Sequence, residues 1–340
     1  MPMILDAMGS DHYPDPEIQA AIETARQFNE EVLLVGSEAL LAPKLKSADP
    51  SNRRVRIVDA PDILEMHEKP VEAVKRKPRN SMAVGLELIK KGEGQAFVSA
   101  GNTGGVMFNA LRTLGRIKGV QRPALTAIFP TRTGHCVVLD IGANADCRPE
   151  FLVEFAVMGS VYAEKVLSKP SPRIGLLSNG EEAGKGNQLV KDAYHLLETA
   201  GLNFIGNVEA KELFGGQADV VITDGFTGNI LLKTSESVAK MITDVLKVEL
   251  TANIVRKAGA LLVKPAFGKI KQMMDPREVG AAPLLGIDGL VFVGHGRSDA
   301  HALVSAMTVA HQAVDANLLD AIRFAIQDKL TQSNETETKE

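Results

Sequence analysis

Lys185 is the residue of this sequence best suited to binding an anion. It stands between Gly184 and Gly186, where a helix is expected to begin, so its charge would add to the partial positive charge of the helix start. The stretch has three residues between Gly180 and Gly184 and no Ser or Thr after the lysine, so it is not a nucleotide-binding P-loop. The indicated chemistry is stabilisation of a phosphate or an oxyanion, and the alternative is a solvated lysine in a first helical turn.

Glycine, asparagine and aspartate recur where an apolar strand is expected to end and a helix to begin. Five loops have this pattern, at 6–12, 99–105, 140–147, 178–187 and 224–229. In an open α/β sheet such positions face the ligand, although aspartates there also cap helices. The amide of Asn229 is a candidate donor to an oxyanion. The candidate substrate-binding side chains are Asn102, Thr103, Asn144, Asp146, Asn187, Asp224 and Thr227.

The sequence offers no obvious covalent nucleophile and no metal site. Cys147 is the one thiol in a loop of this kind, and small loop cysteines are more often packing residues. A Gly-x-Ser-x-Gly elbow is absent, and the seven histidines form no ligand cluster. If phosphate itself is the nucleophile, it needs positioning more than deprotonation. We therefore expect Lys185 to hold phosphate, Asn229 to stabilise the intermediate, and neither a cofactor nor a metal to take part.

Short apolar runs alternate with longer stretches of helical period, which is typical of an α/β fold with a mostly parallel sheet. Strands are expected at 4–6, 32–35, 55–58, 96–99, 124–129, 136–140, 174–177, 204–205, 220–223 and 289–293. Helices are expected at 16–28, 81–90, 104–114, 150–166, 185–199, 228–250 and 298–327. No repeat or low-complexity linker divides the chain, so residues 1–330 are predicted to form one domain, followed by a flexible polar tail at 331–340.

Composition excludes several classes of protein. The chain has 340 residues, a hydrophobic content of 45% and a formal net charge of −4, which argues against disorder and against a dedicated nucleic-acid binder. Two cysteines are too few for a disulfide framework, and the first residues lack the basic region of a signal peptide. No apolar run approaches the roughly 20 residues that span a bilayer. We therefore expect a cytoplasmic protein.

The same loops resemble the PlsX family, the acyl-acyl-carrier-protein:phosphate acyltransferases of bacterial phospholipid synthesis. The similar segments are LDAMG at 5–9, SAGNTG at 99–104, RPAL at 122–125, DIGANADC at 140–147, FAVMGSVY at 155–162, GEEAGKGN at 180–187, DGFTGN at 224–229 and APLLG at 282–286. They follow family order from about residue 3 to 330. The resemblance implies a Rossmann-like sheet with helices on both faces, similar to isopropylmalate dehydrogenases and phosphotransacetylases, with a protruding helical hairpin at about 228–275.

The resemblance also implies an activity and its partners. A fatty acyl group would pass from acyl carrier protein to orthophosphate, and the acyl-phosphate would be handed to a membrane glycerol-phosphate acyltransferase. It implies a homodimer and places Lys185 and Asn229, which lie in two glycine-rich motifs, nearest the chemistry. Two alternatives remain open: a phosphotransacetylase that uses acyl-coenzyme A, and a non-catalytic scaffold for lipid-synthesis enzymes.

The segment 251–274 is basic and partly apolar, with five lysine or arginine residues and no acidic residue. Basic side chains that flank apolar ones suit the surface of an anionic bilayer. We therefore expect peripheral contact with the inner face of the cell membrane, or with the acidic carrier protein. The alternative is a dimer interface. The expected contact residues are Arg256, Lys257, Leu261, Leu262, Val263 and Lys264, and the segment also holds Phe267, Lys269 and Lys271.

Overall fold

One eleven-stranded sheet runs through the molecule. The computed structural model describes residues 1–51 and 53–337, with the backbone alone at 266–267, 269–274, 276 and 330–337. The strand order is β3-β2-β1-β4-β11-β10-β5-β6-β9-β7-β8. Their bounds are β1 Met3–Asp6, β2 Val32–Gly36, β3 Val55–Asp59, β4 Ala96–Ser99, β5 Ala124–Thr131, β6 Gly134–Leu139, β7 Ile174–Leu177, β8 Phe204–Val208, β9 Val220–Ile222, β10 Ala281–Leu285 and β11 Leu290–Gly294.

The sheet has two parallel halves that run in opposite directions. β3, β2, β1, β4 and β11 are parallel to one another, and so are β6, β9, β7 and β8. Between them β10 is antiparallel to both β11 and β5, and β5 is antiparallel to β6. The predicted mostly parallel sheet is therefore confirmed, but β10 was not predicted. Its short run contains Pro283, a residue that argues against a strand when only the sequence is read.

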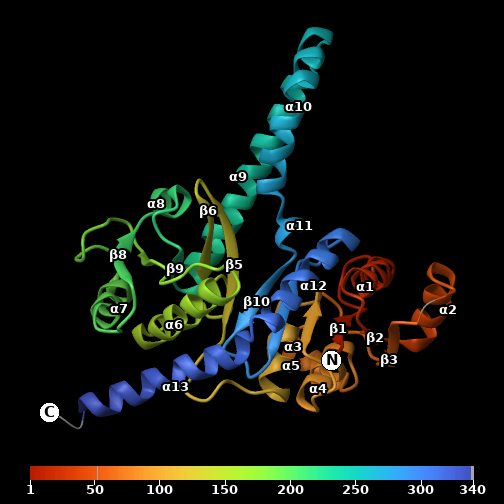
Figure 1. The fold of residues 1–340 in the computed structure, drawn as a ribbon, viewed down its shortest axis with the longest axis horizontal. Coiled ribbons are helices and arrows are strands. Elements are labelled where there is room, and N and C mark those ends of the chain that lie inside the picture. The colour runs from red at the N-terminus through yellow and green to blue at the C-terminus, as the bar shows by residue number, and fades with distance from the viewer. Residues whose placement is uncertain (52, 338–340) are drawn as a thin grey trace.

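Helices cover both faces of the sheet, as predicted (Figure 1). Side chains of α1, α2, α6, α7, α12 and α13 pack into one buried cluster, and those of α3, α4, α5 and α8 pack into the other. The bounds are α1 Asp15–Phe28, α2 Glu38–Ala48, α3 Pro70–Arg76, α4 Ser81–Lys90, α5 Thr103–Thr113, α6 Pro149–Lys165, α7 Gln188–Glu198, α8 Ala210–Gly215, α9 Gly225–Thr251, α10 Ile254–Met274, α11 Pro276–Val279, α12 Ala300–Asp315 and α13 Leu318–Glu337.

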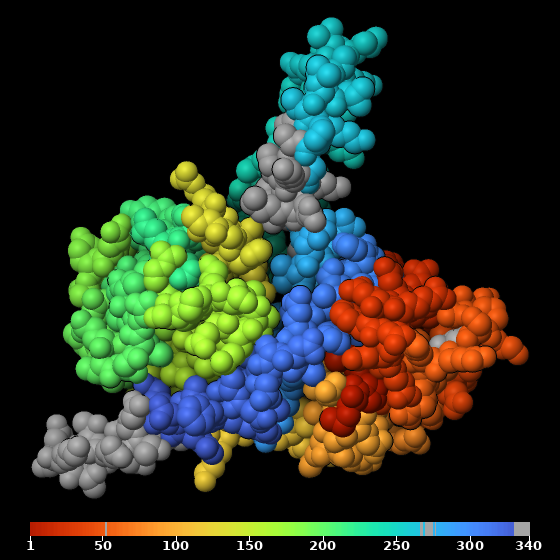
Figure 2. Space-filling view, in the orientation of Figure 1, coloured from red at the N-terminus to blue at the C-terminus, as the bar shows by residue number. Residues whose placement is uncertain are grey.

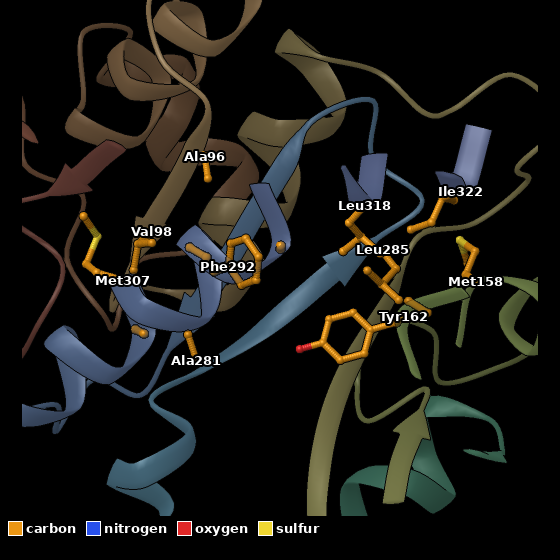
Figure 3. Packing of buried hydrophobic residues seen from close by; sticks show 14 of the residues in the cluster. Ala96, Val98, Met158, Tyr162, Ala281, Leu285, Phe292, Met307, Leu318 and Ile322 are labelled. Atoms are coloured by element: carbon orange, nitrogen blue, oxygen red, sulfur yellow. The ribbon is translucent and has the colours of Figure 1, made fainter. Parts of the chain in front are cut away.

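The core is continuous across the junction between the two halves of the sheet. Figure 3 shows Leu285 of β10 between Tyr162 of α6 and Leu318 of α13, while Phe292 of β11 lies toward Met307 of α12. All five side chains are at most 4% exposed. Because apolar burial is the main favourable term in folding, this shared core stabilises the two halves together.

Helices α9 and α10 form a hairpin that projects from the body (Figures 1 and 2). The predicted protrusion at about 228–275 is therefore present, although α9 begins three residues earlier than the helix expected at 228. Large apolar side chains on the hairpin are exposed, among them Ile254, Val255 and Leu262. Within the described part of the chain, no helix is both long enough and apolar enough to cross a membrane.

Two predicted helices differ from those observed. The single helix expected at 298–327 is two helices, α12 and α13, separated by a turn in which Asn317 has φ 49°. Asparagine tolerates this left-handed conformation better than most residues, so it permits the break. The helix expected from residue 185 begins at Gln188, so Lys185 lies in the preceding loop. Helix α13 runs to Glu337 through most of the segment expected to be a flexible tail, and residues 338–340 lie outside the described part.

Candidate functional site

A cavity of about 490 Å³ opens at the carboxyl ends of β7 and β9. Its wall is mostly apolar and includes Leu152, Leu176, Leu189, Val190, Ile230 and Leu231. Its polar lining comes from two of the predicted loops, through Ser178, Asn179, Asn187, Asp224 and Thr227. Ligands of open α/β sheets bind at such strand ends, so this cavity is the candidate active site.

Helices α6, α7 and α9 begin at the cavity, and Ala210, the first residue of the short helix α8, also lines it. Leu152, Leu189 and Thr227 all line it, and they belong to the first turns of α6, α7 and α9. The free N–H groups of a helix start carry a partial positive charge, so three starts together favour an anion. The carboxylate of Asp224 is also present and reduces this charge. An anion in the cavity would therefore need further positive charge from nearby.

Asn187 and Asp224, two of the predicted binding residues, act as helix caps. Asn187 Oδ1 accepts a hydrogen bond from Val190 N at 3.0 Å, which caps α7. Asp224 accepts from Thr227 N at 2.9 Å and from Thr227 Oγ1 at 2.8 Å, which caps α9. These bonds fix the two helix starts relative to the cavity. The side chains of Asp224 and Thr227 are thereby engaged with each other.

Lys185 lies beside the cavity in an ordered loop. Its backbone N donates to Glu182 O at 2.9 Å, and Gly186 N donates to Asn179 Oδ1 at 2.9 Å. The Lys185 side chain lies across Gly180, where an added Cβ would stand 2.8 Å from Lys185 Cγ. Lys185 is exposed, and its side chain has no ion pair within the part of the chain that the structure describes. Its charge is available to a ligand.

A buried carboxylate holds the loop after β6. Asp140 is 0% exposed and accepts hydrogen bonds from Leu125 N, Gly142 N, Ala143 N and both nitrogens of Asn144, at 2.6–3.1 Å. Burial raises the pKa of Asp140, and these hydrogen bonds oppose that rise. Asn144 Nδ2 also donates to Pro123 O at 2.7 Å. Asn144 therefore positions the loop, and Asp146 of the same loop is exposed.

The first turn of α9 packs directly on this loop. Gly225 N donates to Asn144 O at 2.8 Å, and a Cβ on Gly228 would stand 1.9 Å from Asp140 O. Only glycine permits so close an approach of two backbones. Asn229 is exposed in the next position, with its Cβ 3.9 Å from where a Cβ of Gly142 would be. The glycines of α9 thus fix the position of Asn229.

Asn229 points away from the apolar wall of the cavity. Positions 229, 233 and 236 share a helix face, because residues three or four apart are neighbours on a helix. Lys233 and Glu236 influence the titration of His295, which follows β11 in the other half of the sheet. Partial burial and the charges of Arg297 and Lys233 lower the pKa of His295. This face of α9 is therefore turned toward the end of β11.

The loops after β1 and β4 form a separate cluster of buried polar groups. Ser99 Oγ donates to Asp6 Oδ2 at 2.6 Å, and Met8 N donates to Asp6 Oδ1 at 3.0 Å. Ser10 N donates to Glu17 Oε1 at 3.0 Å. Burial raises the pKa of Asp6 and raises that of Glu17 to about 7. These hydrogen bonds between buried groups hold the two loops in place.

The predicted binding residues Asn102 and Thr103 follow β4, next to this cluster, and do not line the cavity. Asn102 Oδ1 accepts from Gly105 N at 3.0 Å and caps α5, while its Nδ2 donates to Met66 O at 2.8 Å. Thr103 is exposed at the first position of α5. The predicted site residues thus fall into two groups. In the group at 140–147, 178–187 and 224–229, Asn187, Asp224 and Thr227 line the cavity, whereas Lys185, Asn229, Asn144 and Asp146 do not line it.

The thiol of Cys147 is poorly suited to attack a thioester. Burial raises its pKa to about 12, and its Sγ donates to Asn144 O at 3.6 Å. The thiolate is the reactive form of cysteine, so this group is inert near neutral pH. Elsewhere in the described chain, Glu181, Glu209 and Glu212 are close enough to share a cation, but Lys211 Nζ lies 3.0–3.4 Å from all three carboxylates. Lys211 therefore supplies their positive charge.

Sequence reasoning missed the residues that shape the site. Leu152, Ile230 and Leu231 form its apolar wall, but in the sequence they look like ordinary core residues. The close-packed Gly225 and Gly228 stand in a loop that was singled out, yet their role appears only when two backbones are seen together. A glycine pair spaced by three inside a helix was the signal that could have revealed them.

The chain is similar to a protein family, to named relatives and to solved structures. The family model described as fatty acid synthesis protein matches residues 1–320. The chain is 43% identical over 327 residues to the phosphate acyltransferase of Pelotomaculum thermopropionicum, covering 96% of this chain and 95% of that protein. It is 45% identical over 336 residues to the phosphate acyltransferase of Desulforudis audaxviator, covering 99% of each. Among solved structures, a phosphotransacetylase from Streptococcus pyogenes is similar, with a TM-score of 0.61, 18% identity, and coverage of 92% of this chain and 94% of that one. This likeness confirms the predicted fold class.

Proposed function

The chain belongs to the fatty acid synthesis protein family, whose relatives named above are phosphate acyltransferases, and from this premise we propose that it transfers a fatty acyl group from acyl carrier protein to orthophosphate. The resemblance to the PlsX family is thereby confirmed, as is the prediction of an acyltransferase. The observation that carries the proposal is one cavity with apolar walls, three helix starts and Lys185 beside it. Such a cavity suits a substrate with an anionic end and an apolar end.

Orthophosphate would bind between the starts of α7 and α9. The helix starts provide N–H donors and partial positive charge, and Lys185 provides the full charge that offsets Asp224. The loop bonds from Lys185 N and Gly186 N hold that lysine near the mouth before substrate arrives. Preorganised charge of this kind costs no reorganisation during the reaction. Asn187 would contribute by fixing the start of α7.

The reaction needs no enzyme nucleophile. A phosphate oxygen attacks the thioester carbonyl carbon and forms a C–O bond, giving a tetrahedral oxyanion. The C–S bond then breaks, and the carrier leaves as a thiolate that takes a proton from solvent. The raised pKa of Cys147 supports this direct route over an acyl-enzyme. The enzyme's part is to hold the two reactants together and to stabilise the oxyanion.

We assign oxyanion stabilisation to the Asn229 amide, which the packing of Gly228 on Asp140 holds in place. Asn102 and Asn144 we assign to positioning, because their amide groups are engaged with the protein. Thr103 and Asp146 are exposed and remain candidate contacts for the substrate or its carrier. Replacement of Asn229 by Ala is expected to lower kcat about 10²–10³-fold, as for other single oxyanion donors.

The direct test is formation of acyl-phosphate from long-chain acyl carrier protein and orthophosphate. We expect turnover that saturates with phosphate. Activity with acyl-coenzyme A and none with the carrier would instead indicate a phosphotransacetylase, like the structurally similar protein from Streptococcus pyogenes. A folded protein inactive with both donors would favour the scaffold alternative and contradict the proposal.

The exposed side of α10, in the protruding α9–α10 hairpin, is our proposed membrane contact. Leu261 and Leu262 are 70% and 84% exposed, and Val263 is 44% exposed. Lys257 and Lys264 are exposed beside them, whereas Arg256 pairs with Glu249 and adds less charge to the surface. Phe267, Lys269 and Lys271 lie outside the described side chains. Exposed apolar groups flanked by lysines suit the inner face of the cell membrane.

Liposome binding tests this contact. Replacing both Leu261 and Leu262 by Glu should abolish sedimentation with anionic vesicles. The control is Phe324→Glu on α13, because Phe324 is 74% exposed and lies far from the hairpin in sequence. Equal binding by the hairpin variant and the control would contradict the membrane proposal and favour the acidic carrier protein as the partner of this surface.

A second copy of the chain is our proposed partner for the side of α9. Val238, Met241, Ile242 and Val245 are exposed at the spacing of one helix face. An apolar stripe of this kind pairs well with another helix, so a homodimer would bury it. With the hairpin on the membrane, the cytoplasmic enzyme could pass acyl-phosphate to a glycerol-phosphate acyltransferase there. Loss of the dimer in Met241→Glu, measured by light scattering, would support this arrangement.

A further inference from the structure

Three arginines near the candidate site have no carboxylate partner. Arg116, Arg122 and Arg148 are exposed, and none of them forms an ion pair within the part of the chain that the structure describes. Arg173 and Arg323, by contrast, pair with aspartates at 2.9 Å and 2.7 Å. We call the three unpaired residues the arginine patch. Their positive charge is available to a partner.

The guanidinium groups of the arginine patch gather around Gln121 and Phe151. Arg116 Nη1 donates to Gln121 O, and Arg148 Nη2 donates to Gln121 Oε1 at 3.5 Å. Cζ of Arg122 lies 5.9 Å from the centroid of the Phe151 ring, and Cζ of Arg148 lies 4.9 Å from it. The patch is therefore one surface, although its members come from the loop before β5 and from the start of α6.

Glu154 lies beside the arginine patch and offsets part of its charge. Glu154 Oε2 accepts from Gln121 N at 2.8 Å, and its Oε1 accepts from Gln121 Nε2 at 3.0 Å. The charges of Glu154 and Arg116 attract each other, but both carboxylate oxygens are already hydrogen-bonded to Gln121. The two guanidinium groups over the Phe151 ring repel each other. An added anion would therefore lower the electrostatic energy of the patch.

The arginine patch adjoins the cavity without lining it. Phe151, on which two of the arginines lie, directly precedes Leu152, which lines the cavity. Asn144 Nδ2 donates to Pro123 O at 2.7 Å and so joins the loop of the patch to the loop after β6. None of the three arginines belongs to the lining of the cavity. A ligand bound by them would stay on the surface while another part of it enters the cavity.

We propose that the arginine patch is the docking surface for an acidic partner protein, the carrier that delivers the acyl group. This inference rests on the proposed function and adds a place of contact to it. The contact lies at the start of α6, in the body of the molecule and not on the α9–α10 hairpin (Figure 1).

The chemistry of the arginine patch suits clustered carboxylates. The planar fork of an arginine binds a carboxylate through two hydrogen bonds. Guanidinium groups that are already held over Phe151 lose less freedom on binding. Because the whole chain has a net charge of −4, local positive charge is also needed to direct an acidic protein toward the cavity.

Charge reversal tests the docking surface. We would measure the binding of acyl-free carrier protein to Arg122→Glu and to Arg116→Glu by surface plasmon resonance. Arg132→Glu is the matched control, because Arg132 is exposed and has no ion pair among the described residues, but lies at the turn between β5 and β6. We expect the Kd of each patch variant to rise at least tenfold and that of Arg132→Glu to stay within about threefold of wild type.

A third variant and the ionic strength extend this test. Arg148→Glu should weaken binding as well, and its melting temperature shows whether the start of α6 tolerates the change. Binding to the wild type should weaken as salt is added, because the patch is exposed, and the salt dependence should be smaller in the patch variants.

The outcomes separate this inference from the proposed function. A wild-type Kd in both Arg122→Glu and Arg116→Glu would overturn the inference, and formation of acyl-phosphate by the same proteins would leave the proposed function standing. Carrier binding that is lost in the patch variants, in a protein that forms no acyl-phosphate, would support the docking surface and contradict the proposed function. Unchanged carrier binding with lost sedimentation on anionic vesicles would assign the patch to a membrane and also overturn the inference.

Discussion

Two regions of this molecule have nearly the same sequence pattern and different construction. The β1–β4 region, at 6–12 and 99–105, and the α9 region, at 140–147, 178–187 and 224–229, both place glycine and asparagine after strands. In the first, Asp6, Ser99 and Asn102 are hydrogen-bonded within the protein. In the second, Asp140 and Asn144 are bonded in the same way, but Lys185 stays exposed next to the cavity-lining residues Gly186 and Asn187, and Asn229 stays exposed on the face of α9 that does not line the cavity. The shared pattern of loop residues therefore indicates where strands end. Whether a loop residue supports the fold or is free to bind a ligand depends on its hydrogen-bond partners.

The α9 region contains buried supporting groups and, above them, exposed groups. The carboxylate of Asp140 lies beneath and holds the backbone, glycine brings α9 onto it, and Asn229 stands on the surface that results. Rigid support under an exposed donor is what oxyanion stabilisation requires. In the β1–β4 region the corresponding carboxylate, Asp6, supports a loop whose asparagine is turned inward. We expect substitutions in the β1–β4 region to affect stability and those in the α9 region to affect catalysis.

The largest effect should come from Gly228→Ala. A Cβ at this position would stand 1.9 Å from Asp140 O, so α9 must shift before the variant can fold. Overpacking of this kind costs about 1–3 kcal/mol or more, and misplacing a catalytic group by 1 Å can cost about 10²-fold in rate. We expect a lower melting temperature and at least a hundredfold loss of turnover.

Gly259→Ala is the control, because no atom lies within 4 Å of its added Cβ. Alanine is preferred over glycine in a helix by about 1 kcal/mol, so this variant should be as stable as the wild type or more so. Full activity in Gly228→Ala would show that α9 need not contact the Asp140 loop closely.

A smaller effect is expected from Glu17, in the first turn of α1 and bonded to the loop after β1. Burial raises its pKa from 4.5 to about 7, so the folded state binds its proton more tightly than the unfolded state. Between these two pH values the contribution of Glu17 to stability falls as pH rises, by on the order of 1–3 kcal/mol in total. Glu17→Gln should remove this dependence. Denaturant unfolding of both proteins at pH 4.5, 6 and 8 measures it, and parallel pH profiles would contradict this role of Glu17.

The smallest effect is predicted for Asn102→Ala. The change removes the cap of α5 and the bond to Met66 O, which together should cost about 1–2 kcal/mol of unfolding free energy. Turnover at a temperature where the variant is folded should stay within about threefold of wild type. An unchanged stability with a hundredfold loss of turnover would indicate that the β1–β4 region binds substrate, and would contradict the difference drawn between the two regions.

Much of the fold follows from the sequence because strands and helices have different hydrophobic periods. Ten of the eleven strands were expected, since apolar runs such as 96–99 leave little choice, and the protruding hairpin was expected from the family resemblance. β10 was missed because Pro283 opposes a strand assignment, and pairing with β11 and β5 overrides that local preference. The break at Asn317 was missed because the helical pattern continues on both sides of it. Strand pairing decided the first case, and the left-handed conformation of Asn317 allowed the second.

The site was only partly predictable. The loops were found, since glycine and asparagine mark strand ends, and the roles of Lys185 and Asn229 stay predictions. The division into two regions depends on three direction reversals in the middle of the sheet, which no local pattern reveals. The cavity wall was not predictable either, because Leu152 and Leu189 have the same residue type and spacing as core residues.

The central claim is that the α9 region, with Lys185 at its edge, binds the phosphate that attacks the thioester. Its most direct test is the phosphate dependence of turnover in Lys185→Ala, beside Lys191→Ala, an exposed lysine six residues away on α7. We predict that Lys185→Ala loses about 10²-fold or more in kcat/KM for phosphate at an unchanged melting temperature, while Lys191→Ala stays near wild type. Wild-type phosphate dependence in a folded Lys185→Ala protein would contradict the claim.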